Sequence, residues 1–158
     1  MEQRFIGWRE WLALPELGVP AIKAKIDTGA RTSALHTFVI EPYLDRGRSM
    51  VRFGVHPLQR RRDVELFCRA EVVDRRAVTS SNGQRETRYV IRTPMELAGR
   101  RWPVELTLTN RDTLNFRMLL GRTALQGVFI DPAASYLAGR ALAKAYRPKR
   151  RRSEKEVR

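Results

Sequence analysis

The chain has 158 residues, 42% of them hydrophobic and 30% charged, with a formal net charge of +14 and a pI near 11.2. This length predicts one domain that can bury its own core. No apolar run approaches the ~18 residues of a transmembrane helix, and the N-terminus, MEQRFIGWREW, lacks the apolar stretch of a signal peptide. Cys68 is the single cysteine, so no intrachain disulfide can form. We therefore expect a cytoplasmic protein without a membrane-spanning segment.

Half of the net positive charge lies near the C-terminus. From Arg140 onward the chain has nine Lys and Arg residues against two Glu residues, a balance of +7. A second basic cluster is Arg60-Arg61-Arg62. Such runs are usually solvated tails and loops; the alternative is an electrostatic footprint for RNA, the ribosome or an acidic substrate. Because no zinc finger, RNP-type aromatic signature or GXXG clamp is present, nucleic acid binding is expected only through the basic tail.

Short strands dominate the expected secondary structure. The first clear strand covers residues 21–26, where apolar and basic residues alternate up to Asp27. Further strands are expected at residues 35–43, 50–55, 64–73, 88–95, 102–108, 118–120 and 128–130. The turn at residues 45–48 separates the second strand from the third, and Asn82-Gly83, a strong hairpin signal, lies between the fourth and the fifth.

Helix is scarce in the expected structure. A turn or two is expected over residues 123–126, and the alanine-rich residues 133–146 predict a C-terminal helix. Many short strands predict an all-β fold, a small closed barrel or sandwich of about seven or eight strands. We expect residues 1–138 to form this domain and residues 139–158 to form a basic helical or disordered tail.

Metal and nucleophile chemistry find little support in the sequence. His36, His56 and Cys68 lack the short spacings of zinc motifs, which leaves a site built from Asp27, His36 and His56 as the metal alternative. Ser33 is not in a G-x-S-x-G elbow, and Cys68 lies in an apolar strand pattern that favours a structural thiol. The chain has no Walker loop and no GxGxxG motif.

Asp27 opens the string Asp-Thr-Gly-Ala at the end of the first clear strand. The simple interpretation is a strand-ending turn in which Asp accepts backbone N–H groups. Two features favour a functional role. An apolar stripe along the strand leads to Asp27, and the string Leu-Leu-Gly-Arg follows at residues 119–122.

Together, Asp27-Thr28-Gly29-Ala30 and Leu119-Leu120-Gly121-Arg122 resemble the two signature elements of retropepsin-like aspartic proteases. In that fold the catalytic loop comes first, and an apolar-apolar-Gly strand crosses behind it and enters a short helix. The resemblance implies a closed acid-protease barrel with a flap hairpin at residues 80–86 and a closing strand at residues 128–131. Residues 37–70 would form an additional hairpin layer.

A closer resemblance is to a bacterial family long labelled "ATP-dependent zinc protease" and now regarded as retropepsin-like. The segments that carry it are residues 7–10, 14–17, 24–30, 32–36, 80–83, 88–90, 106–111 and 118–122. Some members are encoded beside ATP-grasp peptide ligases, so the resemblance implies association with such a ligase or with a ribosomal component. The sequence contradicts the old label, since it has neither an ATP-binding loop nor a zinc motif, and we expect no cofactor and no metal.

The resemblance also assigns the site. The catalytic residues would be Asp27, Thr28 and Gly29. The substrate-binding residues would be Ala30, Arg31, Ser81, Asn82 and Gly83. Structural support would come from Leu119, Leu120, Gly121 and Arg122.

An acid-protease mechanism needs two neighbouring aspartates that share one proton. The chain has one Asp-Thr-Gly string, so the resemblance implies a C2 homodimer in which each subunit contributes Asp27. Thr28 would brace the two loops across the axis, and Gly29 would let the backbone approach the pair.

Arg31 departs from the viral retropepsins, which have at this position an aspartate that pairs with the arginine after the downstream glycine. Arg122 would therefore need another partner, for example Glu16, Asp112 or Asp131. Arg31 also places positive charge near the cleft, which favours acidic peptides.

Three functions follow from these observations. The first is a homodimeric aspartic endopeptidase acting on a peptide, in particular an acidic or glutamate-tailed one. The second is a catalytically weak peptide-binding or regulatory module that works with an ATP-grasp ligase or the ribosome. The third is the metalloprotease of the old label, for which cleavage would survive Asp27→Asn.

Overall fold

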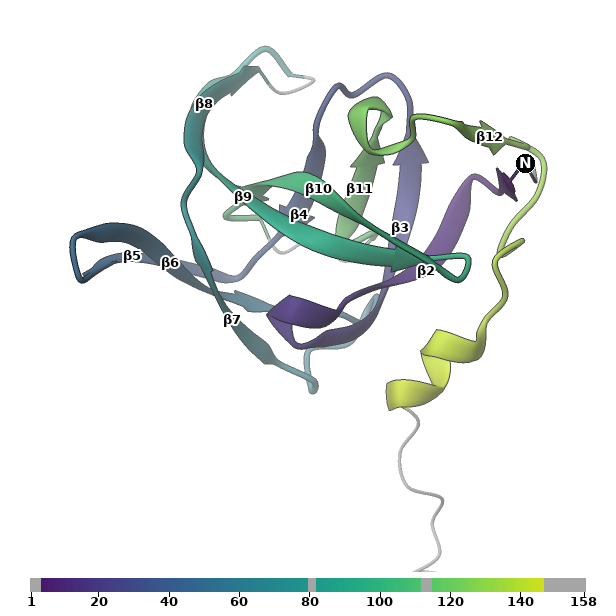
Figure 1. Cartoon of the computed structure of the whole chain (residues 1–158), viewed down its shortest axis with the longest axis horizontal. Helices are drawn as coiled ribbons and strands as arrows, with labels where there is room; N and C mark the ends of the chain where they lie inside the picture. Colours follow the sequence, from purple (N-terminus) through teal and green to yellow (C-terminus); the bar gives the residue numbers. More distant parts are fainter. Residues whose placement is uncertain (1–3, 80–81, 112–114, 147–158) are drawn as a thin grey trace, which may run out of the picture.

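The computed structural model describes residues 4–79, 82–111 and 115–146, and β-strands dominate this part of the chain (Figure 1). The strands are β1 (Arg4–Ile6), β2 (Arg9–Leu14), β3 (Val19–Asp27), β4 (Ser33–His36), β5 (Val39–Asp45), β6 (Arg48–Val55), β7 (Leu66–Glu71), β8 (Asp74–Thr79), β9 (Arg85–Leu97), β10 (Arg100–Thr109), β11 (Met118–Gly121) and β12 (Val128–Ile130). The helices are short 3-10 segments: η1 (Pro15–Leu17), η2 (Arg122–Ala124) and η3 (Ala141–Tyr146). The predicted all-β class is confirmed, as is a single helical turn directly after Gly121.

Six of these strands close into a ring. The order is β10-β4-β11-β3-β2-β9, and β9 pairs back with β10 along a long antiparallel ladder. The junction between β2 and β9 is narrow, at Ala13 and Glu96. β8 extends the ring by pairing with the first half of β9, which forms the hairpin expected around Asn82-Gly83. The predicted closed arrangement of strands is therefore a ring of six strands, and the hairpin of β8 and β9 extends from it.

The additional layer expected at residues 37–70 is a separate three-stranded sheet of β5, β6 and β7. β5 and β6 are joined by the predicted tight turn, where Arg46 and Gly47 have φ angles of 53° and 79°. Positive φ at both central residues matches the twist of the two strands. Val51 and Phe53 of β6 are fully buried in the common core, whereas the β5–β6 turn extends away from the ring (Figure 1).

The strand expected at residues 35–43 is two strands in different sheets. The N–H of Thr37 donates to the carbonyl of Thr109 in the ring, and the N–H of Phe38 donates to Gly54 of β6. The chain changes sheets between these two residues, which the sequence pattern of residues 35–43 does not reveal.

The C-terminal helix is shorter than predicted over residues 133–146, because only Ala141–Tyr146 is helical. The N–H groups of Leu137 and Ala138 donate to the carboxylate of Glu10 rather than to helical carbonyls. Long-range hydrogen bonds therefore override the helix propensity of the alanine-rich segment.

Glu10 is fully buried and connects both ends of the described chain. Its carboxylate accepts N–H groups from Gly7 at 2.7 Å, Leu137 at 2.8 Å and Ala138 at 3.0 Å. Beyond the expected domain end at residue 138, the hydroxyl of Tyr146 contacts the backbone of β3. The boundary itself stays a prediction, and the tail from residue 147 lies outside the described residues. Within the described ranges, no helix has both the length and the apolar character required to span a membrane.

Candidate active site

Asp27 lies at the end of β3, which is paired on both edges. β2 runs antiparallel to β3 on one side, and β11 runs parallel to it on the other, with Gly121 opposite Asp27. Ile22 and Ala24 are fully buried, so the strand cannot slip without exposing its apolar face. Asp27 is thus held at a fixed position at the C-terminal end of β3.

A tight turn follows Asp27. The N–H of Gly29 donates to Asp27 Oδ1 at 3.1 Å, and the N–H of Ala30 donates to the Asp27 carbonyl at 3.1 Å. A Cβ on Gly29 would lie 3.3 Å from Oδ1, so a side chain there would press against the carboxylate. Asp27 is half-buried, and Thr28 and Gly29 are exposed. The turn holds one carboxylate oxygen and leaves the carboxyl group accessible.

β11 and η2 support this turn from behind. A Cβ on Gly121 would lie 2.7 Å from the Thr32 carbonyl carbon, so only glycine fits. The N–H of Gly121 donates to Ser33 Oγ at 3.0 Å, and the N–H of Arg122 donates to the Ala30 carbonyl at 2.9 Å. Leu120 is fully buried, whereas Leu119 is half-buried. The two strings singled out in the sequence are therefore in direct contact.

Within the described residues, Arg122 pairs with neither Glu16 nor Asp131, two of the partners considered for it. Its Nη1 lies 3.4 Å from the carbonyl oxygens of both Thr28 and Gly29, and it forms no ion pair with a carboxylate of the described residues. Glu16 instead pairs with Arg101 at 3.0 Å. The Arg122 side chain therefore contacts backbone carbonyls of the turn after Asp27, and Asp112 lies outside the described residues.

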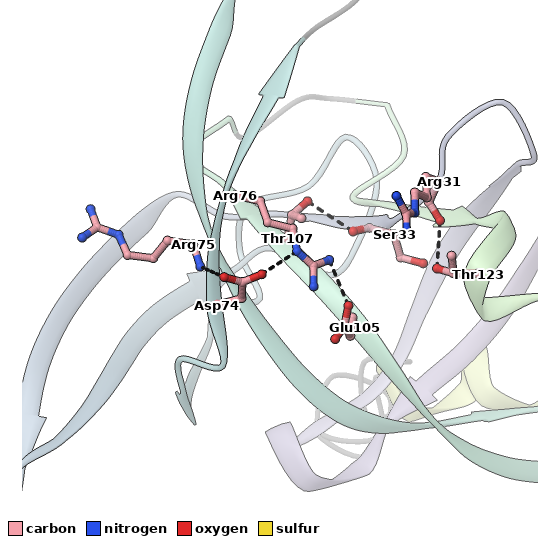
Figure 2. A network of polar contacts seen from close by, with 8 residues as sticks. All are labelled: Arg31, Ser33, Asp74, Arg75, Arg76, Glu105, Thr107 and Thr123. Atoms are coloured by element: carbon pink, nitrogen blue, oxygen red, sulfur yellow. Dashed lines mark hydrogen bonds and ion pairs between the residues drawn. The ribbon is translucent and has the colours of Figure 1, made fainter.

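Asp27 faces a cleft of about 1010 Å³. Asp27 and residues 29–32 contribute to its walls, together with residues of β4, β8, β9, β10, β11 and η2. Figure 2 shows Arg31 and Thr123 on one side, where Thr123 Oγ1 donates to the Arg31 carbonyl at 2.8 Å.

Of the expected substrate-binding residues, Ala30 and Arg31 line the cleft. Asn82 and Gly83 are exposed at the end of the β8–β9 hairpin and are not among the lining residues. Ser81 lies outside the described residues. The hairpin lines the cleft through its strands, for example with Val78 and Thr79.

Arginine dominates the charge of the cleft. Its arginines are Arg31, Arg76, Arg88, Arg92 and Arg111, and its carboxylates are Asp27 and Glu105. Arg88 pairs with Glu86, and Arg76 pairs with both Asp74 and Glu105. The other three arginines form no ion pair with a carboxylate of the described residues. Of the five, the sequence singled out only Arg31, since Arg76, Arg88 and Arg92 reach the cleft through the pairing of their strands and Arg111 follows the end of β10.

His36, which the sequence suggested only as a member of the metal alternative, also lines the cleft. Its Nδ1 lies 3.1 Å from both the Arg111 carbonyl and Thr109 Oγ1. Burial lowers the pKa of His36, and the nearby guanidinium groups of Arg88 and Arg111 act in the same direction, against the hydrogen bond to the Arg111 carbonyl. The neutral imidazole is therefore favoured in this basic cleft.

The metal alternative is not assembled in the described part of the chain, which contains no group of three His, Cys, Asp or Glu residues able to hold a metal ion. His56 lies outside the cleft, stacked on Phe38 at 4.1 Å and 3.0 Å from Glu65. Cys68 is buried, and burial raises the pKa of its thiol to about 12, as expected for a structural cysteine.

A family model described as RimB-like, the retropepsin-like aspartic endopeptidase RimB, matches residues 5–141. The chain belongs to this RimB-like family. The resemblance inferred from the strings at Asp27 and Gly121 is confirmed.

Curated relatives of this RimB-like chain are longer proteins. It is 51% identical over 135 residues to a probable alpha-L-glutamate ligase of Shewanella pealeana, covering 85% of this chain and 30% of the relative. It is 46% identical over 149 residues to a protein of the same name from Desulfotalea psychrophila, covering 91% of this chain and 32% of the relative. The chain thus spans about a third of the length of these relatives.

A crystal structure of a Legionella pneumophila protein of unknown function has the same fold. Its TM-score is 0.70 at 24% identity, and the match covers 87% of this chain and 99% of that one.

Proposed function

We propose that this RimB-like domain is an aspartic endopeptidase whose catalytic pair consists of Asp27 from two subunits. The observation that carries the proposal is the position of Asp27, an accessible carboxylate on a rigidly supported turn that faces a large cleft. One carboxylate cannot act as acid and base at the same time. The other carboxylate of the cleft, Glu105, is paired with Arg76.

In the proposed reaction, a water molecule lies between the two Asp27 carboxyl groups. The ionised carboxylate takes a proton from this water as its oxygen attacks the peptide carbonyl carbon, and the protonated carboxyl group donates its proton to the carbonyl oxygen. Proton transfer to the amide nitrogen then allows the C–N bond to break, which releases an acid and an amine. The Gly29 N–H, bonded to Asp27 Oδ1, orients each carboxylate.

An exposed aromatic pair supports the proposed dimer. Phe5 of β1 and Phe129 of β12 stack with ring centroids 5.4 Å apart, yet they are 53% and 47% exposed. Adjacent apolar rings left in water are typical of a surface that a partner covers. β12 follows η2 along the chain, directly after the segment that supports the Asp27 turn (Figure 1).

We expect Phe129→Asp to convert the dimer to a monomer and to lower kcat/KM at least about 10-fold, because a hot-spot aromatic is replaced by a charge. Analytical ultracentrifugation and a cleavage assay measure the two effects. Leu44→Asp is the matched control, since Leu44 is 76% exposed in the separate β5–β6–β7 sheet. If both variants lose dimerisation and cleavage equally, or if Phe129→Asp stays dimeric, this surface is not the dimer interface.

The substrate class we propose is an acidic peptide. Arg31, Arg92 and Arg111 line the cleft without a carboxylate partner among the described residues. Clustered positive charge with low-dielectric walls attracts anionic ligands. The relatives named probable alpha-L-glutamate ligase point to glutamate-rich chains in particular.

The proposed function is tested by cleavage of a hexaglutamate segment within a reporter peptide, compared with its hexaglutamine counterpart. We expect at least about a 10-fold preference in kcat/KM for the glutamate peptide, declining as salt screens the cleft. Equal cleavage of both peptides would disprove the acidic specificity, and no cleavage of either would count against the endopeptidase.

The long relatives support a second candidate function. A domain related to part of a glutamate ligase could serve as a peptide-binding module that presents acidic chains to an ATP-grasp ligase. Binding of the glutamate peptide without cleavage favours this candidate. Both functions suit a cytoplasmic protein, a location that stays a prediction.

A further inference from the structure

Arg76 of β8 is held by two carboxylates from different strands. Its Nε donates to Asp74 Oδ2 at 2.7 Å on the same strand, and its Nη1 donates to Glu105 Oε1 at 2.9 Å on β10. β8 and β10 are not neighbours, because each pairs with β9. The Arg76 side chain therefore reaches over β9 to Glu105, as Figure 2 shows.

Glu105 differs from the other carboxylates around the cleft. It lines the cleft together with Asp27, whereas Asp74 and Glu86 are not among the lining residues. Its contact with Arg76 is the one that an acidic substrate side chain would make, a carboxylate oxygen on a guanidinium nitrogen. In the free protein, Glu105 thus occupies a position suited to a substrate carboxylate.

The two carboxylates that bind Arg76 differ in whether a ligand can replace them. Asp74 binds Nε and keeps the guanidinium in place, while Glu105 binds at the outer Nη1. The side chains of Arg76 and Glu105 are 37% and 36% exposed. Ion pairs this exposed are weak, so an incoming carboxylate can replace Glu105 without disturbing the fold.

We propose that Glu105 is a specificity-determining residue that competes with acidic substrate side chains for Arg76. This inference rests on the proposed acidic-peptide function. A substrate carboxylate at this position replaces Glu105 and forms the ion pair with Arg76 itself. A neutral substrate cannot replace Glu105, so the ion pair between Arg76 and Glu105 remains. Glu105 thereby lowers the affinity for every peptide whose acidic side chain is out of register with Arg76.

The test measures equilibrium binding in an Asp27→Asn background, so that cleavage does not interfere. The probe is fluorescein-labelled hexaglutamate, followed by fluorescence anisotropy with the full chain. We expect Glu105→Gln to tighten Kd about 5-fold and Arg76→Gln to weaken it about 10-fold, with no effect of Glu105→Gln once Arg76 is already Gln.

Two controls separate competition at Arg76 from a general change in charge. Glu105→Asp keeps the charge but shortens the side chain, so it loses reach to Arg76 and is expected to tighten Kd about 3-fold. Glu96→Gln removes a charge outside the cleft, where Glu96 lies 3.5 Å from Arg101, and is expected to leave Kd within about 2-fold. Thermal melting checks that each variant folds.

The outcomes separate this inference from the function it rests on. If Glu105→Gln tightens binding equally with and without Arg76, or if Glu105→Asp has no effect, competition at Arg76 is wrong. The proposed acidic-peptide function is not contradicted by either result. If hexaglutamate binds no better than hexaglutamine in the Asp27→Asn background, the acidic-peptide function and this inference both fail.

Discussion

Asp27→Asn is expected to lower kcat/KM for peptide cleavage by about 10³-fold or more, equivalent to ~4 kcal/mol of transition-state stabilisation. An amide can neither accept the proton of the attacking water nor donate one to the substrate carbonyl. The fold is expected to survive, because the Asn Oδ1 can still accept the Gly29 N–H that now lies 3.1 Å from Asp27 Oδ1. Cleavage rates and thermal melting measure the two effects.

Two controls test whether the catalytic pair is shared. Asp45→Asn removes an exposed carboxylate in the β5–β6–β7 sheet and should leave cleavage unchanged. Wild-type and Asp27→Asn chains are mixed and allowed to exchange subunits. The remaining activity should be proportional to the square of the wild-type fraction, because only wild-type homodimers have two Asp27 carboxylates. A loss in direct proportion to that fraction would mean that each subunit acts alone.

The second large effect is expected for Glu10→Ala, which should lower the free energy of unfolding by about 3–5 kcal/mol. The substitution leaves the N–H groups of Gly7, Leu137 and Ala138 without their buried acceptor. It also opens a cavity between β2 and the C-terminal segment. Urea unfolding followed by circular dichroism measures the change.

Glu10→Gln and Glu16→Ala are the matched controls for this effect. Gln keeps the volume and one acceptor oxygen but presents an NH₂ group to backbone donors, so we expect a loss of about 1–3 kcal/mol. Glu16 is 62% exposed in its pair with Arg101, and its replacement should stay within ~0.5 kcal/mol of the native protein. A Glu10→Ala variant with native stability would show that Glu10 does not hold the C-terminal segment.

The turn after Asp27 and its support could be found from the sequence because their constraints are local. Gly121 is required where a Cβ would lie 2.7 Å from the Thr32 carbonyl carbon, and a Cβ on Gly29 would lie 3.3 Å from the Asp27 carboxylate oxygen. Close backbone approach leaves a glycine at a fixed place in a short string. The two strings therefore identified the turn and the strand behind it.

The arginine cleft could not be found in the same way, because it depends on strand register. A two-residue turn at Asn82-Gly83 would pair Ser81 with Gln84, whereas the hairpin pairs Thr79 with Arg85 and so Arg76 with Arg88. A register shift of one residue moves each side chain to the opposite face. The sequence therefore does not tell which arginines of β8 and β9 face Asp27.

The pairing of β1 with β12 bears on how this domain occurs in larger proteins. Arg4 lies opposite Val128 in a parallel pair, so the first and last strands of the described chain meet at one place on the surface. Domains with neighbouring ends can be appended to another domain, or inserted between two parts of one, without distortion of their own sheets. The matched segment makes up 30% of the probable alpha-L-glutamate ligase of Shewanella pealeana, so a unit similar to this chain occurs within a longer protein.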